Sequence, residues 1–377
     1  MRHDSGPAVA VIADDATGAA DAALAFAETG WTAHLELAGA WTPFSGAQAA
    51  AALSTDARAA ADAWDATEHA VRAAQTTGAD RIYLKIDSTG RGTIADQIAG
   101  ARAALGDPLT VLCPAFPAVG RTVAAGRLLV DGTDAAVGPA GTDPVTPLHT
   151  SDLTALVPGA RTADRLEPDA TGIVVLDAAI DEDLDRIAAS IAILEPHRPV
   201  LAVGSAGLAR ALARVWHPAP HDVTVAPQAT DLVVVSSLNP ATRDQITHAV
   251  RRGIAHTVLD VPNTTDEALE DAIRALPRPA IASTSAFRDP EGAQHLAHRL
   301  GTAAARAIEA TRPGTVGLVG GDGAAAALNA LGAPRALVAG RIAPGVPLLR
   351  LPDLDVWTKA GGFGPPGLLT DLIQPAH

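Results

Sequence analysis

Cysteines and long apolar runs are nearly absent from the sequence, and each absence excludes a class of protein. The single cysteine, Cys113, cannot form an internal disulfide, which is typical of a reducing compartment. No apolar run approaches the roughly 18 residues that a membrane-spanning helix needs. Residues 1–6 also lack the apolar centre of a signal peptide. We therefore expect a soluble cytoplasmic protein.

Positive charge is the second scarcity. Lys and Arg together number 28 against 42 Asp and Glu, which gives a formal net charge of −14. A chain this acidic repels the phosphate backbone of nucleic acids and the surface of anionic membranes. We expect neither as a partner, and any small anion must be held by local groups.

Lysine is the scarcest of the charged residues. Only Lys85 and Lys359 are present, and both lie in segments that resemble functional motifs. A compact ammonium group has properties that an arginine fork does not reproduce, so retention of these two lysines favours a functional role. Chance retention is the alternative.

The 377 residues predict an α/β fold, because short apolar runs alternate with alanine-rich helical stretches. We expect two lobes, 1–218 and 230–377, each a mostly parallel sheet flanked by helices, with the active site in the cleft between them. The proline-bearing segment 217–230 reads as the linker. The expected strands are Ala8–Ala13, Ala33–Leu37, Arg81–Ile86, Leu109–Cys113, Ile173–Leu176, Val200–Val203, Leu232–Val235, Thr257–Val261, Ala280–Ser283, Val316–Val319, Ala336–Val338 and Val356–Lys359.

Polar residues directly after the first expected strand are candidates for binding, because open α/β sheets bind ligands beyond the carboxyl ends of their strands. Asp14 and Asp15 follow that strand, with Thr17 close behind. The two acids could accept hydrogen bonds from sugar hydroxyls, take a proton, or hold Mg²⁺. Alternatively, Asp15 or Thr17 only caps the following helix.

Two further segments of the first lobe carry positive charge. Lys85 and Arg91, with Asp87 and Ser88 between them, suit a carboxylate because a guanidinium grips it with two parallel bonds. The alternative is a Lys–Asp ion pair beside a capped helix. Arg121 ends a stiff loop with two prolines, which is either a donor site or purely structural.

The second lobe has a glycine-rich turn, Gly320–Gly323, between an apolar strand and the expected helix 324–331. Glycines there let backbone N–H groups approach phosphate oxygens at a helix N-terminus. Lys359 stands beside another glycine turn that begins at Gly361. Neither a Walker A motif nor an early G-x-G-x-x-G is present, so the turn alone is a weak signal.

Taken together, the motifs resemble those of the four-carbon acid sugar kinases. The resemblance covers nearly the whole chain and rests on Ala13–Ala19, Lys85–Gly92, Pro114–Thr122, Leu128–Gly132, Gly320–Asp322, Ile342–Pro347 and Lys359–Gly364. It implies an ATP-dependent kinase that phosphorylates the terminal hydroxyl of threonate, erythronate or a 3-oxo-tetronate, with ATP and Mg²⁺ as cofactors. It further implies that the first lobe binds the acid and the second binds the nucleotide.

The same resemblance assigns the site residues. Those implied for the acid are Asp14, Asp15, Lys85, Asp87, Ser88 and Arg91, to which we add Thr17 and Arg121. Those implied for ATP are Ser237, Gly320, Gly321, Asp322, Gly323 and Gly361, to which we add Asn239 and Lys359. The chain departs from the family pattern at Leu238, Asn239, Gly323, Gly362 and Gly90, mostly in the nucleotide lobe.

Three acids are candidates for the transfer step. Asp15 is expected to open the helix, which leaves Asp14 freer to meet the accepting hydroxyl, and Asp322 is expected at the transfer end. Other readings are a ribokinase-type sugar kinase, which would take a neutral sugar, and a non-catalytic sugar-acid-binding protein with a diverged nucleotide site. A homodimer is a further expectation.

Overall fold

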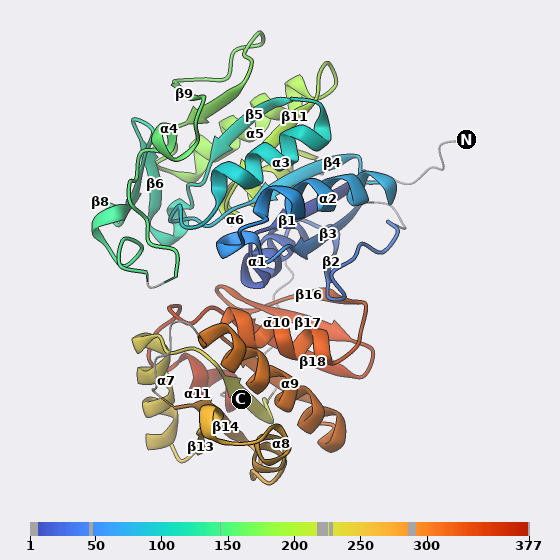
Figure 1. The fold of residues 1–377 in the computed structure, drawn as a ribbon, viewed down its shortest axis with the longest axis vertical. Helices are drawn as coiled ribbons and strands as arrows, with labels where there is room; N and C mark the ends of the chain where they lie inside the picture. The colour runs from blue at the N-terminus through green and yellow to red at the C-terminus, as the bar shows by residue number, and fades with distance from the viewer. Residues whose placement is uncertain are drawn as a thin grey trace. The chain divides into compact units, whose positions relative to one another are not determined.

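The computed structural model describes residues 7–44, 48–143, 145–216, 225, 229–285 and 292–375. The chain divides into two compact units, unit 1 (Met1–Asp222) and unit 2 (Val223–His377). Strands and helices alternate in both, as the sequence pattern predicts (Figure 1). Most of the expected linker at 217–230 lies outside the described residues.

The sheet of unit 1 is entirely parallel among its described strands. The interior strand β1 (Ala8–Ala13) is fully buried, as expected for a strand covered on both faces. The strand order is β2 (Thr32–Glu36), β3 (Ala49–Ser54), β1, β4 (Arg81–Lys85), β11 (Val200–Gly204), β5 (Leu109–Cys113), β10 (Ile173–Leu176) and β9 (Ala160–Ala163). The predicted parallel α/β fold is confirmed here.

Helices cover both faces of this sheet. One layer pairs α2 (Ala63–Thr76) with α3 (Ile94–Leu105), which lie together across one face in Figure 1. In the other layer α1 (Ala16–Ala27) packs on α6 (Ala206–Trp216), and α6 packs on α5 (Asp181–Leu194). Alanine is abundant in α1, and its small side chains let this helix lie close to the sheet. The short α4 (Leu153–Leu156) lies near β9.

A small antiparallel sheet extends from unit 1 and was not expected from the sequence. It consists of β6 (Arg121–Ala124), β7 (Arg127–Val130) and β8 (Thr133–Asp134). The stiff loop with two prolines contains the 3₁₀ turn Pro117–Val119 and leads directly into β6, so the loop starts a hairpin. Bridges from Val123 to Ala178 and from Arg127 to Asp152 tie the hairpin to the rest of the unit.

The sheet of unit 2 is parallel except at one side. Its order is β13 (Ala255–Leu259), β14 (Ala280–Thr284), β12 (Leu232–Val235), β15 (Thr315–Val319), β18 (Leu354–Lys359), β17 (Val346–Leu351) and β16 (Arg335–Ala343). The last two strands are antiparallel to their neighbours. β17 was missed because Pro347 breaks the strand pattern, and the structure accommodates it where the β16–β17 register shifts.

The helices of unit 2 again form two layers. α8 (Asp266–Arg274) packs on α9 (Ala293–Thr311), and α9 packs on α10 (Gly321–Ala330). On the other side α7 (Pro240–Arg251) packs on α11 (Leu368–Ile373). Across the described residues of both units, no helix is long and apolar enough to cross a membrane.

Trp357 is the centre of the unit 2 core. Its indole is fully buried and lies over Gly317, where any side chain would collide with the ring. The indole Nε1 donates to Thr230 Oγ1 at 2.9 Å, and that hydroxyl donates to the carbonyl of Leu372 at 2.8 Å. One tryptophan thus ties α11 to the sheet.

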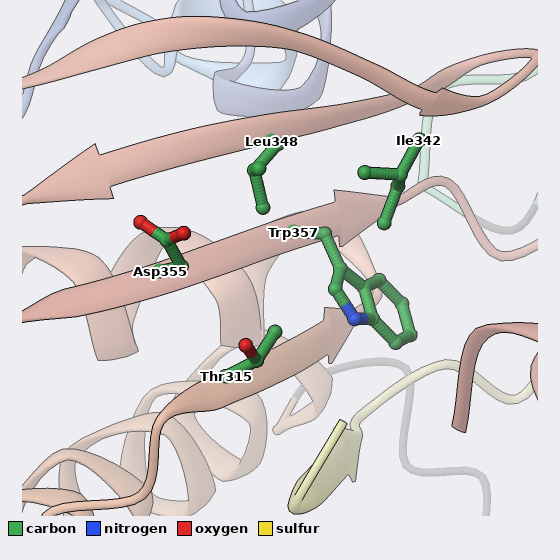
Figure 2. A pocket seen from close by; sticks show the side chains of 5 residues that line it. All are labelled: Thr315, Ile342, Leu348, Asp355 and Trp357. Carbon is green, nitrogen blue, oxygen red and sulfur yellow. The ribbon is translucent and has the colours of Figure 1, made fainter. Parts of the chain in front are cut away.

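A narrow pocket lies beside the Trp357 indole, as Figure 2 shows. Its lining combines the apolar side chains of Ile342 and Leu348 with Thr315 and Asp355. Ile342 is the first residue of the motif Ile342–Pro347, whereas the other four lie outside the predicted motifs, and we read the pocket as a packing gap between strands.

Candidate active site

Arg58 is the centre of a charge cluster in unit 1. Its Nε donates to Asp14 Oδ2 at 2.7 Å and its Nη2 to Asp14 Oδ1 at 3.0 Å. Its Nη1 lies 2.9 Å from Asp15 Oδ2, and its Nη2 lies 3.8 Å from Asp87 Oδ1. One guanidinium therefore holds three of the acids that the sequence predicted for the site.

Sequence reasoning missed Arg58 because it missed the strand that precedes it. β3 is mostly alanine and reads as helix, yet it pairs with β1. The 3₁₀ turn Ala57–Ala59 follows β3, and the Arg58 backbone N–H donates to the Asp14 carbonyl at 3.2 Å. Recognising β3 as a strand would have put Arg58 at the same sheet edge as Asp14.

Burial and charge oppose each other throughout this cluster. Burial raises the pKa of the Asp14 carboxyl, and Arg58 only partly offsets that effect. Burial also raises the pKa of Asp87, but Arg58 and Arg91 outweigh it and hold this pKa well below its usual range. Burial alone would lower the pKa of Arg58, yet the carboxylates of Asp15, Asp14 and Asp87 raise it well above normal. Arg58 is therefore a permanently charged group.

Asp15 caps helix α1, which is the structural alternative that the sequence predicted. It is the N-cap of α1, and its Oδ1 accepts the Gly18 backbone N–H at 2.7 Å. The helix cap is therefore real, and it coexists with the Arg58 contact through the other carboxylate oxygen. Thr17 lies half-buried in the first turn of the same helix.

Lys85 ends β4 and is buried with 5% exposure. Its ammonium donates to the Ile86 carbonyl at 2.9 Å and crosses the bare surface of α1 at Gly18. A Cβ at Gly18 would lie 2.8 Å from Lys85 Nζ and 2.6 Å from Asp15 Oδ1. Glycine is needed there because the lysine passes so close to the helix.

Arg91, and not Lys85, makes the ion pair with Asp87. Its Nε and Nη2 reach the two Asp87 oxygens at 3.0 Å each, while its Nη1 reaches Asp143 Oδ2 at 2.8 Å. Asp143 was not foreseen, and its other oxygen accepts the Thr146 backbone N–H at 2.8 Å. Ser88 is half-buried beside Asp87.

Arg121 lies at the start of β6, and its guanidinium donates to the Val119 carbonyl. None of its described contacts is with the Arg58 cluster. The structure thus brings Asp14, Asp15, Lys85, Asp87 and Arg91 together through Arg58 and Gly18, and it gives Arg121 a separate local contact.

Two loops meet at the carboxyl ends of β12 and β15 in unit 2. The Ser236 backbone N–H donates to the Val319 carbonyl at 2.9 Å. Gly320 has a φ of +110°, and a Cβ on it would lie 2.9 Å from the Ser237 nitrogen. Gly323 packs against the Ser236 side chain. The glycine turn is shaped by this close approach of two backbones.

The third loop follows β18 and is arranged around Lys359. Its ammonium donates to the carbonyls of Ala360 and Phe363 at 2.8 Å each and of Gly361 at 3.4 Å. Burial lowers the pKa of Lys359 to about 8. Gly361 lies against the Ser237 side chain, where any substituent would collide. Lys359 therefore shapes the loop through its backbone oxygens.

The residues predicted for the nucleotide are consequently neighbours. Gly320 N–H donates to the Lys359 carbonyl at 3.1 Å, which links the second and third loops. Asn239 caps α7 by accepting the Ala241 N–H at 3.0 Å. Asp322 is exposed in the first turn of α10. The carboxyl ends of β12, β15 and β18 thus carry a single surface of small residues.

Two family models together match most of the chain. Residues 9–212 match a sugar-binding N-terminal domain, and residues 232–369 match a nucleotide-binding C-terminal domain. A D-threonate kinase from Bordetella bronchiseptica is 36% identical, with 98% of this chain and 97% of that protein covered. The chain belongs to the four-carbon acid sugar kinase family.

Other relatives and solved structures agree with this family. A 3-oxo-tetronate kinase from Cupriavidus necator is 27% identical, over 98% of this chain and 97% of that protein. A Bordetella bronchiseptica structure, a domain-swapped dimer with bound citrate, is 34% identical with a TM-score of 0.52, covering 98% of each chain. A Haemophilus influenzae structure has a TM-score of 0.71 at 22% identity, covers 96% of this chain and 98% of that one, and supports the fold alone.

Proposed function

We propose that this chain is an ATP-dependent kinase that phosphorylates the terminal hydroxyl of a four-carbon sugar acid. The observation that carries the proposal is the meeting of three small-residue loops in unit 2, at the strand ends where α/β sheets bind phosphates. Unit 1 contributes the charge cluster around Arg58, which also includes the cations of Lys85 and Arg91. Family membership favours this assignment over a ribokinase-type enzyme.

Of the tetronates, D-threonate is our first choice of substrate. The Bordetella D-threonate kinase is the more similar of the two curated relatives described above. Lys85 and Arg91 suit the carboxylate of such an acid, since each is a cation fixed at the same strand end. A neutral sugar would not require them.

We propose that unit 1 binds the sugar acid and that unit 2 binds the nucleotide. In unit 1 we assign binding of the sugar acid to five residues: Thr17, Lys85, Asp87, Ser88 and Arg91. Asp14 and Asp15 would orient Arg58. Arg121 stays a weaker prediction. In unit 2 we assign the nucleotide to Ser237, Asn239, Gly320, Gly321, Gly323 and Gly361, with Lys359 positioning its loop. That Asp14 itself meets the accepting hydroxyl stays a prediction, and its two Arg58 contacts favour an orienting role.

Mg²⁺ fits the chemistry of the nucleotide loops. Among the described residues no group of three or more His, Cys, Asp or Glu gathers to hold a metal. Mg²⁺ in kinases commonly takes one or two carboxylates together with phosphate oxygens and water, so Asp322 alone could be its protein ligand. When bound, the ion would neutralise charge on the phosphates. The prediction that Asp322 acts at the transfer end rests on this position.

Phosphoryl transfer needs mainly positioning and charge stabilisation from the protein. The glycine loops would offer backbone N–H groups to the ATP phosphates, while the unit 1 cations fix the acid. We also propose cytoplasmic location and self-association as a homodimer. The dimer in a relative's crystal supports the latter, and light scattering tests it.

The deciding experiment measures ADP release with Mg·ATP and a panel of tetronates, first among them D-threonate. Acid-dependent ADP release together with a phosphorylated acid, identified by mass spectrometry, supports the kinase. Asp322→Asn should lower kcat with acid binding intact. Tight acid binding without turnover would instead favour the non-catalytic sugar-acid-binding protein.

A further inference from the structure

Asp21 is a fourth acid beside the Arg58 cluster, and it lies outside the motif Ala13–Ala19. It lies on α1, three residues after Gly18 and four after Thr17, so these three share one face of the helix. The side chain is half-buried. Unlike its neighbours, Asp21 makes no hydrogen bond or ion pair to any residue within the described ranges.

The other acids of the cluster are already engaged. Both Asp14 oxygens accept from Arg58, and Asp15 is divided between Arg58 and the Gly18 N–H. Asp87 is held by Arg91 through both oxygens. These carboxylates orient arginines and a helix end. Asp21 is the acid of this group that accepts no hydrogen bond from any described residue.

Three charged groups act on Asp21 electrostatically, and they come from different elements: Lys85 from β4, Asp15 from the start of α1 and Arg210 from α6. Lys85 donates one described hydrogen bond to the Ile86 carbonyl. Its side chain passes over Gly18, one helical turn before Asp21 on α1. Arg210 is paired with Glu28 at 2.8 Å. Neither cation is tied to Asp21, so an acceptor and a cation stand near each other without closing a pair.

This arrangement suits a hydroxylated ligand more than a structural role. Burial raises the pKa of Asp21 to about 7, against the opposing effect of Lys85. A carboxyl group with a pKa near neutrality can take a proton during turnover and release it afterwards. A group with both oxygens bound by arginine, such as Asp14, is poorly placed to do so.

We propose that Asp21 accepts the proton of the substrate hydroxyl that attacks ATP. Lys85 would hold the sugar acid in place during this step. The inference rests on the proposed kinase function. As the hydroxyl oxygen bonds to the γ-phosphorus, the bond from that phosphorus to the bridging oxygen breaks, and its electron pair leaves with ADP. The hydroxyl proton moves to Asp21 and from there to solvent.

The test compares Asp21→Asn with Asp65→Asn, a matched control at an exposed position of α2 that touches no predicted site residue. With D-threonate and Mg·ATP, we expect D21N to lose about 100-fold or more in kcat. Binding of ATP, measured by calorimetry, should stay within about twofold of wild type. The acidic limb of the wild-type kcat/KM profile should have a midpoint near pH 7 and should vanish in D21N.

The outcomes separate the two proposals. A wild-type protein that phosphorylates no tetronate overturns the kinase function and the Asp21 role with it. An active wild type, with D21N as active as D65N, overturns only the role of Asp21. If D21N does not fold, the wild-type profile decides: a limb near pH 7 supports Asp21, and a flat profile from about pH 5 to 8 overturns it.

Discussion

Arg58 grips Asp14 with two parallel bonds, Nε to Oδ2 at 2.7 Å and Nη2 to Oδ1 at 3.0 Å, across 44 residues of sequence. Asp14 has no exposed surface, so this pair is shielded from water on the acid's side. The geometry matters because the same guanidinium also reaches Asp15 and Asp87. One side chain therefore joins the ends of β1 and β4 into a common site.

Arg58→Lys tests that junction. Lysine keeps the charge but cannot bridge two oxygens and three acids at once. We expect the unfolding free energy to fall by about 2–4 kcal/mol, because Asp14 is left buried and poorly paired. Denaturant unfolding of purified protein measures it, and the affinity for D-threonate should drop in parallel.

Arg72→Lys is the control for this change. Arg72 pairs with Glu68 on the exposed side of α2, and exposed pairs of this kind contribute about 0.3–0.5 kcal/mol. Equal losses in both variants would show that the Arg58 network adds no stability of its own.

Much of the fold could be predicted because the local pattern and the tertiary environment agree. β1, β5, β10 and β12 have the bounds that their apolar runs predict. The sequence pattern did not predict β3 and β17, and each omission has a physical reason. The alanines of β3 favour a helix locally, and Pro347 removes an N–H from β17, yet the sheet offers both segments partners.

The candidate site was predictable only in part for a related reason. Asp14, Lys85 and Arg91 stand out because they lie at or soon after strand ends within recognisable motifs. Arg58 and Asp143 act through pairings 44 and 52 residues away in the chain, which no local pattern encodes. The sequence singles out Lys359 as one of only two lysines, but its three carbonyl contacts emerge only from the folded loop.

Gly320→Ala tests the nucleotide loop. Its φ of +110° and the Ser237 nitrogen at 2.9 Å from a Cβ leave no room for a methyl group. We expect ATP affinity to fall at least tenfold while D-threonate affinity stays unchanged, because the change displaces the loop that meets phosphate. Calorimetric titration with each ligand separately measures both values.

Gly332→Ala supplies the matched control. Gly332 also has a positive φ, +70°, but nothing lies within 4 Å of its Cβ position. Backbone strain alone would affect both variants. An ATP affinity that falls equally in both would attribute the effect to stability and not to the loop.

Lys359→Met should act through its loop. The change leaves the half-buried carbonyls of Ala360 and Phe363 without their donor, which costs at most about 1–3 kcal/mol for each such group. We expect weaker ATP binding with D-threonate affinity intact. Trp357, two residues earlier in β18, is the only tryptophan of unit 2 in the sequence, so the near-ultraviolet signal follows this region. Normal ATP binding in the variant would leave Lys359 without a positioning role.

The pKa of Asp21 predicts a pH-dependent stability difference that is independent of catalysis. The folded protein raises this pKa from 3.8 to about 7, so between these values the folded chain binds the Asp21 proton more tightly than the unfolded chain does. The stability that the protonated carboxyl contributes is complete below the lower value and is lost as the pH rises through about 7.

Asn cannot titrate. D21N should therefore match wild type near pH 4 and exceed it at pH 8 by about 2 kcal/mol, the linkage value reduced for partial solvent exposure. Denaturant unfolding at the two pH values measures the difference, with D65N expected to show none. A D21N difference that does not grow with pH would mean that Asp21 is ionised at little cost in the folded protein, and it would remove the reason to expect proton transfer near neutrality.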